Sequence, residues 1–209
     1  MRTYLFDLDG TLLDSIDLIL TTFHHTSRVH LGREFPDSHW LAGLGTPLRD
    51  QLGRVARSKE ELAAMLDTYV AYNLTHHDDK AKPYPGVVEA VRRLHRMGAA
   101  LGLVTSKLRA GTERGLRLLG LEEEFAVRVC ADDVVNGKPH PEPVLMALQA
   151  FGASPKETLF IGDSPHDIEA GKRAGVTTVA VAWGPFPRET LGAEEPDYWL
   201  EEPADIFDL

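Results

Sequence analysis

The pattern of apolar and polar residues changes along the chain, separating a helical stretch from a stretch of alternating strands and helices. Residues 3–8 are mostly apolar and are bounded by a charged turn, which predicts a short buried strand. From about residue 14 to residue 80, apolar side chains recur at helical spacing, as at Ile16, Ile19 and Phe23. No strand pattern is evident in that stretch, so we predict a helical insertion there.

The rest of the chain alternates between short apolar runs and amphipathic segments. These predict strands at 100–104, 127–131, 158–161 and 177–182, and helices at 87–97, 108–119, 142–151 and 165–174. The tail, 197–209, adds an edge strand and a last helical turn. Such alternation predicts an α/β fold with a doubly wound, mainly parallel, Rossmann-like sheet. We place this core at residues 1–13 and 82–209, and the inserted all-helical domain at residues 14–81.

Polar side chains follow three of the predicted strands. Asp7, Thr105 and Asp163 each lie where an apolar run ends. In open parallel sheets, ligands bind beyond the carboxyl ends of the strands. We therefore expect these three side chains to face one site.

The segment Asp7-Leu8-Asp9-Gly10-Thr11 carries two carboxylates on alternate residues, which share one face of an extended chain. Asp7 is suited to act as a nucleophile, and Asp9 to donate a proton to a leaving oxygen and later take one from water. Gly10 allows the backbone to approach a phosphate closely, and Thr11 adds a hydrogen-bond donor. Taken alone, the segment also fits a turn with two solvated acids.

Two further segments supply groups that bind phosphate oxygens. Thr105 and Ser106 offer hydroxyl and N–H donors at a strand end, and Lys138 offers a positive charge that can hold a transferring phosphoryl group. Each has an ordinary alternative, because a Thr-Ser pair often caps a helix and a loop lysine is usually solvated.

Asp163 and Asp167 are four residues apart, which places them on one side of a first helical turn. Asp163 is a candidate metal ligand, and Asp167 a candidate for water-mediated ligation or for orienting Lys138. Carboxylate oxygens with water and substrate phosphate suit Mg²⁺. The alternative is an acidic cap on a helix N-terminus. Four such segments in this order favour metal-assisted phosphoryl transfer over the separate alternatives.

Composition narrows the class of partner. The net charge of −10 argues against nucleic acid or an anionic membrane surface as a partner, but not against a small anionic substrate beside a metal. A single cysteine, Cys130, excludes an intramolecular disulfide and fits a cytoplasmic protein. The apolar run at residues 3–6 is too short for a signal sequence or a membrane span.

With these motifs in place, the whole chain resembles the haloacid dehalogenase (HAD) superfamily of phosphatases, with a helical cap inserted after the first strand. Asp7 to Thr11 matches the first family motif, Thr105 or Ser106 the second, Lys138 the third, and Gly162 to Asp167 the fourth. The resemblance implies an aspartyl-phosphate intermediate on Asp7. It also implies Mg²⁺ held by Asp7, the Asp9 carbonyl and Asp163, with Asp167 beside them.

Within the superfamily, the chain is most similar to phosphoglycolate phosphatases and to HAD-type pyrophosphatases. Residues 43–48 and 182–184 resemble both groups, whereas 23–26 and 76–79 look closer to the pyrophosphatases. This resemblance implies hydrolysis of 2-phosphoglycolate or, alternatively, of pyrophosphate. Dehalogenases lack an acid at the position of Asp9, so a halide substrate is disfavoured. A sugar-phosphate phosphatase or mutase stays open, as does a non-catalytic binding protein, although the latter is expected to lose Asp7, Asp9 or Lys138.

Residues of the predicted cap are candidates for recognising the leaving group of the substrate. Arg49 follows a glycine-rich loop and is a candidate for binding a second anionic group, unless it is simply a surface arginine. Lys107 is a further candidate beside the second motif, with the same alternative of a surface side chain. The histidine pairs at 24–25 and 76–77 are not expected to form a metal site, because adjacent helical residues point in different directions. We expect a monomer or a homodimer acting on a small phosphorylated substrate.

Overall fold

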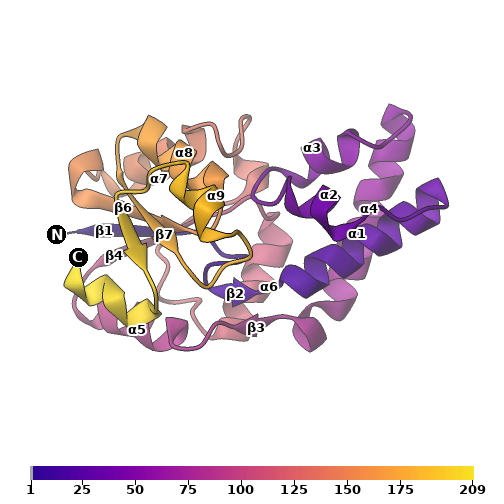
Figure 1. Ribbon diagram of the computed structural model, residues 1–209. Coiled ribbons are helices and arrows are strands. Elements are labelled where there is room, and N and C mark those ends of the chain that lie inside the picture. Colours follow the sequence, from indigo (N-terminus) through magenta and orange to yellow (C-terminus); the bar gives the residue numbers. More distant parts are fainter. Residues whose placement is uncertain (1) are drawn as a thin grey trace.

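A six-stranded parallel sheet forms the centre of the protein, as seen in a computed structural model that describes residues 2–209 (Figure 1). Its order is β5-β4-β1-β6-β7-β8, and every neighbouring pair is parallel. The strands are β1 (Thr3–Phe6), β4 (Ala100–Val104), β5 (Val127–Val129), β6 (Thr158–Gly162), β7 (Thr177–Val181) and β8 (Tyr198–Leu200). The predicted doubly wound α/β fold is confirmed.

Helices cover both faces of this sheet because successive strand residues point in opposite directions. In β1, Tyr4 and Phe6 pack on one face, while Leu5 packs on the other. The first face is covered by α5 (Val87–Arg96) and α6 (Arg109–Leu119), and the second by α7 (Glu142–Phe151) and α8 (Pro165–Ala174). The apolar strand runs in the sequence are therefore buried on two sides.

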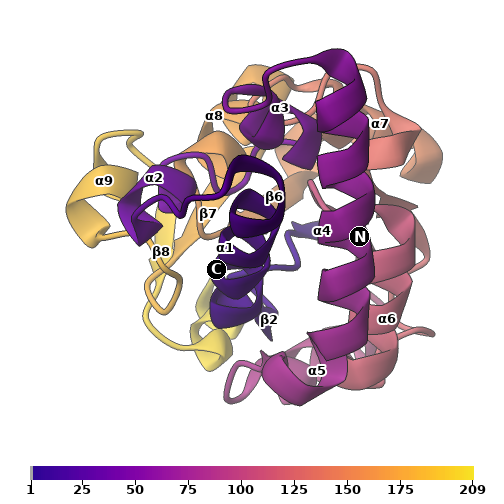
Figure 2. The same ribbon diagram turned by 90° about the vertical axis from the view of Figure 1, so that its right-hand side faces the viewer.

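The insertion after the first strand consists of helices and has its own apolar core. Its elements are α1 (Ile16–Leu31), α2 (Asp37–Leu41), α3 (Leu48–Gly53) and α4 (Lys59–Lys80). Phe23 stacks on Trp40 with ring centroids 4.3 Å apart, and Leu52 and Met65 are fully buried beside them. Figures 1 and 2 show these helices, which we call the cap, on one side of the sheet.

A two-stranded antiparallel pair joins the cap to the sheet, and the sequence pattern did not predict it. It is formed by β2 (Leu13–Asp14) and β3 (Lys82–Pro83). Strands of two residues are too short to show alternation. We propose that the boundary between core and cap lies at this pair.

Smaller elements complete the chain. Strand β1 ends at Phe6, earlier than predicted, because the Leu8 carbonyl accepts hydrogen bonds from the backbone N–H groups of the turn that follows. The predicted tail strand is present as β8, and the last turn is a 3₁₀ helix, Pro203–Asp208. A short helix, α9 (Arg188–Gly192), was not predicted. Within residues 2–209, no helix is long and apolar enough to cross a membrane.

The cap core should be essential to folding stability. Leu52 is 0% exposed, so Leu52→Ala should lower the free energy of unfolding by about 2–5 kcal/mol through lost burial and a residual cavity. Urea denaturation measures this. Val29→Ala is the matched control, because Val29 is 57% exposed on α1, and its effect should stay within about 0.5 kcal/mol. Equal effects of the two substitutions would contradict the assignment of Leu52 to the cap core.

Candidate active site

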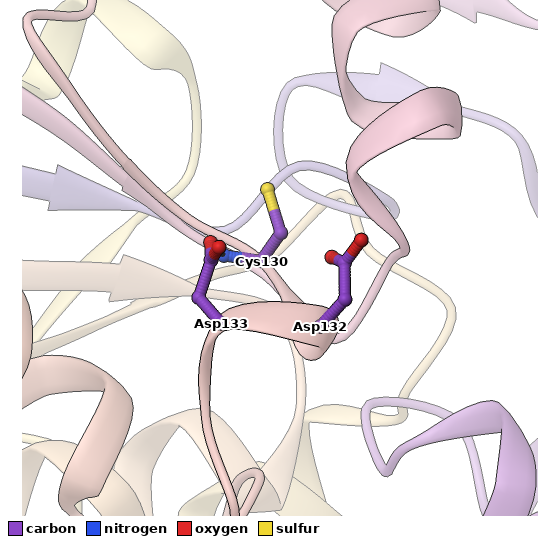
Figure 3. Close-up of side chains that lie close together, drawn as sticks. All are labelled: Cys130, Asp132 and Asp133. Atoms are coloured by element: carbon purple, nitrogen blue, oxygen red, sulfur yellow. Dashed lines mark hydrogen bonds between the residues drawn. The ribbon is translucent and has the colours of Figure 1, made fainter.

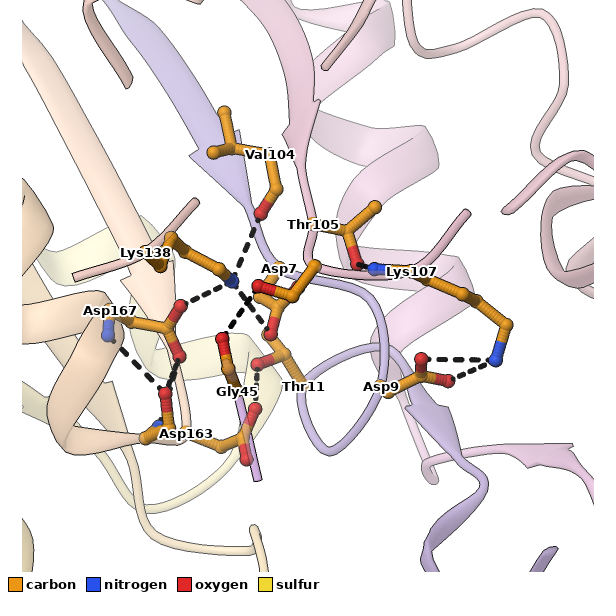
Figure 4. A network of polar contacts seen from close by, with 12 residues as sticks. Asp7, Asp9, Thr11, Gly45, Val104, Thr105, Lys107, Lys138, Asp163 and Asp167 are labelled. Carbon is orange, nitrogen blue, oxygen red and sulfur yellow. Dashed lines mark hydrogen bonds and ion pairs between the residues drawn. The ribbon is translucent and has the colours of Figure 1, made fainter. Parts of the chain in front are cut away.

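The carboxyl ends of three adjacent strands bring the predicted polar residues together. Asp7 follows β1, Thr105 follows β4 and Asp163 follows β6, and these strands are neighbours in the sheet. Figure 4 shows their side chains converging with that of Lys138. Residues far apart in the sequence thus share one edge of the sheet.

Asp7 lies at the bottom of this site and is only 4% exposed. Its Oδ2 atom is 3.1 Å from Lys138 Nζ, whereas its Oδ1 atom is buried without a hydrogen-bond partner among residues 2–209. Burial raises the pKa of Asp7 from 3.8 to about 7, although the nearby lysine opposes this shift. One carboxylate oxygen is therefore free to contact a ligand.

Lys138 is held by three oxygens at the end of a loop before α7. Its ammonium donates to Asp167 Oδ1 at 2.6 Å and to the Val104 carbonyl at 3.3 Å, and it pairs with Asp7. Burial alone would lower the pKa of Lys138, but the two carboxylates raise it above its usual range. Lys138 is therefore a fixed positive charge beside Asp7.

The first turn of α8 positions Asp167. Ser164 caps this helix, and Asp167 Oδ2 accepts hydrogen bonds from the Ser164 backbone N–H at 3.0 Å and from its hydroxyl at 2.6 Å. A Cβ atom on Gly162 would lie 2.4 Å from the Asp167 Cβ, so this close packing requires glycine. Both Asp167 oxygens have partners within the protein, which makes this residue a support for Lys138.

Asp163 is anchored by the turn that follows β1. Thr11 donates its hydroxyl hydrogen to Asp163 Oδ1 at 2.7 Å. Gly10 has φ +88°, and a Cβ there would lie 2.3 Å from Asp163 Oδ2, so a side chain at this position would collide with the carboxylate. The indole N–H of Trp183 donates to the Thr11 carbonyl at 2.9 Å, which adds a further hydrogen bond to the turn.

The carboxylate cluster fits a divalent cation. Asp7, Asp163 and Asp167 are all buried, and each places an oxygen within 4.8 Å of the others. Lys138 supplies one positive charge in contact with this group. Burial raises the pKa of Asp163, as it does that of Asp7. Repulsion from the neighbouring carboxylates raises it further, since one lysine does not balance the charge of three acids. Hard oxygen ligands and an unpartnered Asp7 oxygen suit a small divalent metal.

Asp9 has a different environment from Asp7. Its two carboxylate oxygens lie 2.8 and 3.0 Å from Lys107 Nζ (Figure 4). One of them also accepts a hydrogen bond from Ser15 at 2.5 Å. Its side chain therefore lies outside the carboxylate cluster. The two acids of the first motif have separate basic partners, which fits two separate roles.

A cavity of about 110 Å³ lies above these acids, between the core and the cap. The core contributes Asp7, Asp9 and the segment 105–108, and the cap contributes mostly apolar side chains. A small group attached to a phosphate on Asp7 can occupy this space. The cap therefore closes the site from the side opposite the sheet.

The two other predicted substrate-binding side chains differ in position. Ser106 lines the cavity and donates its hydroxyl hydrogen to the Gly45 carbonyl of the cap at 2.6 Å, so it also links core and cap. Arg49 is exposed on α3 and lines a neighbouring groove, which also reaches Lys138, instead of the cavity. Thr105, like Ser106, lines the cavity.

The four histidines of the two predicted pairs have other partners. His24 pairs with an acid of α2, and His77 with the acid that follows it. His25 stacks on Tyr72, and His76 packs against the same ring at a tilted angle. None of the possible metal-binding groups in the described part of the chain includes a histidine.

A second close group, formed by Cys130, Asp132 and Asp133, has a structural explanation (Figure 3). Asp133 accepts hydrogen bonds from the Cys130 backbone N–H at 2.8 Å and from the Arg109 guanidinium at 2.5 Å. Asp132 accepts from the Arg109 backbone N–H. These acids cap a 3₁₀ turn and the start of α6, and burial raises the pKa of the Cys130 thiol.

Several residues that support the site were not predicted from the sequence. Ser15 binds Asp9, Trp183 secures the turn after β1, and Gln51 lines the cavity. Ser164 was detectable, because serine three residues before Asp167 is a helix-capping pattern. The others gave no local signal, since their contacts depend on how distant segments pack.

Comparison with known proteins agrees with this geometry. Residues 4–181 match the family model described as haloacid dehalogenase-like hydrolase. The chain belongs to this family. A relative from Anoxybacillus flavithermus, named pyrophosphatase PpaX, is 42% identical over 100% of this chain and 96% of its own length.

Two solved structures share the HAD fold over almost the whole chain. A "putative phosphoglycolate phosphatase" from Lactobacillus plantarum has a TM-score of 0.88 and 26% identity, covering 99% of this chain and 98% of its own. A "putative beta-phosphoglucomutase" from Bacteroides vulgatus has a TM-score of 0.87 and 27% identity, covering 100% and 86%. The family match and these relatives together show that the chain is an HAD phosphatase.

Metal binding should depend on pH through Asp7. In the metal-free protein its pKa is about 7, against 3.8 unfolded, so the folded state retains a proton that the unfolded chain releases. The contribution of Asp7 to stability is thus complete below about pH 4 and is lost as the pH rises to about 7. Because a metal requires the ionised carboxylate, Mg²⁺ should raise Tm more at pH 8 than at pH 5, as measured by calorimetry.

The control for this prediction is Asp163→Asn, which removes one ligand charge from the carboxylate cluster and should abolish most of the Mg²⁺-dependent rise in Tm. An equal rise at both pH values in the wild type would contradict the role of Asp7, and an unchanged rise in the variant would contradict that of Asp163.

Proposed function

We propose that this HAD phosphatase is a Mg²⁺-dependent phosphohydrolase that forms an aspartyl-phosphate on Asp7, with pyrophosphate as its leading substrate. The observation that carries the proposal is the buried Asp7, with one oxygen paired to Lys138 at 3.1 Å and the other unpartnered among residues 2–209. Such a carboxylate is oriented by a fixed cation and still has an oxygen available for attack.

Each residue of the site has a role in the proposed reaction. An Asp7 oxygen attacks phosphorus, the bond to the leaving oxygen breaks, and Asp9 gives that oxygen a proton. Lys138 and Thr105 hold the phosphoryl oxygens while negative charge is redistributed. In the second half, Asp9 takes a proton from water as the water oxygen attacks phosphorus, and the Asp7 carboxylate leaves.

The metal and its supporting residues complete this assignment. Mg²⁺, when bound, would be held by Asp7, Asp163 and the Asp9 carbonyl and would neutralise charge on the phosphoryl group. Asp167 keeps Lys138 beside Asp7 through the 2.6 Å contact. Thr11 and Gly10 keep Asp163 at the same edge of the sheet.

Two observations support pyrophosphate as the first candidate. The relatives named pyrophosphatase PpaX are 39–42% identical over the whole chain. The cavity beyond Asp7 is small, at about 110 Å³, and fits a leaving group of few atoms. 2-Phosphoglycolate is the second candidate, because its leaving group is also small and anionic and a solved structure carrying that name shares the fold.

Inorganic phosphate release distinguishes these substrates. With Mg²⁺ present, kcat/KM for pyrophosphate should exceed that for 2-phosphoglycolate and sugar phosphates by roughly a hundredfold. Asp7→Asn should lower phosphate release by about a thousandfold or more, because an amide cannot serve as the nucleophile. Phosphate release is followed colorimetrically across the substrate panel.

Asp208→Asn is the matched control, since Asp208 is exposed near the end of the chain and should leave the rate unchanged. Chelation should stop release, and added Mg²⁺ should restore it. A substantially active Asp7→Asn variant would disqualify Asp7, and conversion of a sugar phosphate without phosphate release would indicate a mutase.

A further inference from the structure

The cavity above Asp7 has a cationic end formed by Lys107. Its side chain is only 10% exposed, and its ammonium contacts both oxygens of Asp9 at 2.8 and 3.0 Å. The chain packs tightly on α6, because a Cβ on Gly111 would lie 2.8 Å from Lys107 Cε. Lys107 is therefore held in place at the cavity wall.

We propose that Lys107 is a specificity-determining residue that selects substrates with a negatively charged leaving group. The charged group takes the place of Asp9 in the ion pair with Lys107. This inference rests on the proposed phosphohydrolase function and assigns a residue to its substrate selectivity. It concerns the group on the far side of the scissile bond, away from the phosphoryl oxygens that Lys138 holds.

The rest of the cavity wall leaves Lys107 as the available counterion. The cap side chains that line the cavity are all uncharged, and they include Phe23, Leu44, Gln51, Tyr69 and Asn73. Within residues 2–209, Lys107 is the one lysine or arginine that lines this cavity, since Arg49 faces the neighbouring groove. An anionic leaving group that did not reach Lys107 would be desolvated without a partner, which is costly.

Gln51 marks the same region as a place for a ligand. It is 6% exposed, and its Oε1 atom is buried without a hydrogen-bond partner among the described residues. Its Nε2 atom is 3.4 Å from the Thr46 carbonyl, which is a long contact that holds the amide weakly. Gln51 is one of the cap residues that line the cavity, so the cap adds a polar group to the cavity wall and no charge.

The exchange also connects leaving-group charge to catalysis. In the present structure Asp9 is held by Lys107 and Ser15. An anion that takes over the Lys107 contact frees the Asp9 carboxylate, which can then take up a proton from solvent and turn to donate it to the leaving oxygen. A neutral leaving group offers no such replacement, so the ion pair persists and Asp9 stays turned away. Selectivity for anionic leaving groups then appears in kcat/KM.

A matched pair of esters tests this directly. 2-Phosphoglycolate and 2-hydroxyethyl phosphate are nearly equal in size but differ in whether the leaving group bears a carboxylate. The wild type should prefer 2-phosphoglycolate by roughly 10- to 100-fold in kcat/KM, as expected for a charge-assisted contact. Lys107→Met and Lys107→Gln should both bring this ratio close to one, and Lys107→Arg should restore part of it.

Lys156→Met is the matched control, because Lys156 is exposed in the 3₁₀ turn before β6, and it should leave the ratio unchanged. If the Lys107 variants slow both esters by the same factor, Lys107 only orients Asp9 and the proposal fails. A wild-type ratio near one also contradicts it, although the phosphohydrolase would stand. Failure of the wild type to release phosphate from either ester or from pyrophosphate would instead overturn the proposed function.

Discussion

The burial of three carboxylates around one lysine is the constraint on which the site depends. Asp7, Asp163 and Asp167 are removed from water at the edge of the sheet, and Lys138 contacts two of them. Repulsion among such charges would disperse them if their backbones were free to move. The strand ends and the capped first turn of α8 prevent that. The result is a preorganised environment that a cation and a phosphoryl group can complete.

The sheet and the cap contribute different parts of this arrangement. The parallel sheet places strand ends β4, β1 and β6 side by side, so the groups that act on phosphorus lie on rigid elements. The cap, which has its own apolar core, covers the site and contributes mostly neutral side chains. In the proposed reaction, the residues that act on phosphorus therefore lie at the edge of the sheet, and the cap and Lys107 determine which leaving group fits.

The sequence predicted those features that are encoded locally. The apolar run of β1 and the helical spacing of the cap were visible in the order of residues, as were Asp7 and Asp163 after predicted strands and Lys138 in a predicted loop. The pair of β2 and β3 was missed because two residues carry no periodicity. The contact of Lys107 with Asp9 spans 98 positions and depends on how β1 and β4 pack.

Arg49 illustrates why a residue type alone is insufficient. It lies two positions before Gln51 on α3, and helical residues two apart point to nearly opposite sides. Gln51 faces the cavity, so Arg49 faces outward. The position of the glycine-rich loop identified the right segment, but the helical phase decided which side chain enters the site.

Detection of a covalent intermediate would show whether Asp7 is the nucleophile. The protein is mixed with pyrophosphate and Mg²⁺, quenched in acid within milliseconds, digested and analysed by mass spectrometry. The account predicts one phosphoryl group on the peptide containing Asp7, formed and lost at rates consistent with turnover, and none on that peptide in Asp7→Asn. Turnover without any phosphorylated Asp7, or phosphorylation at another residue, would contradict it.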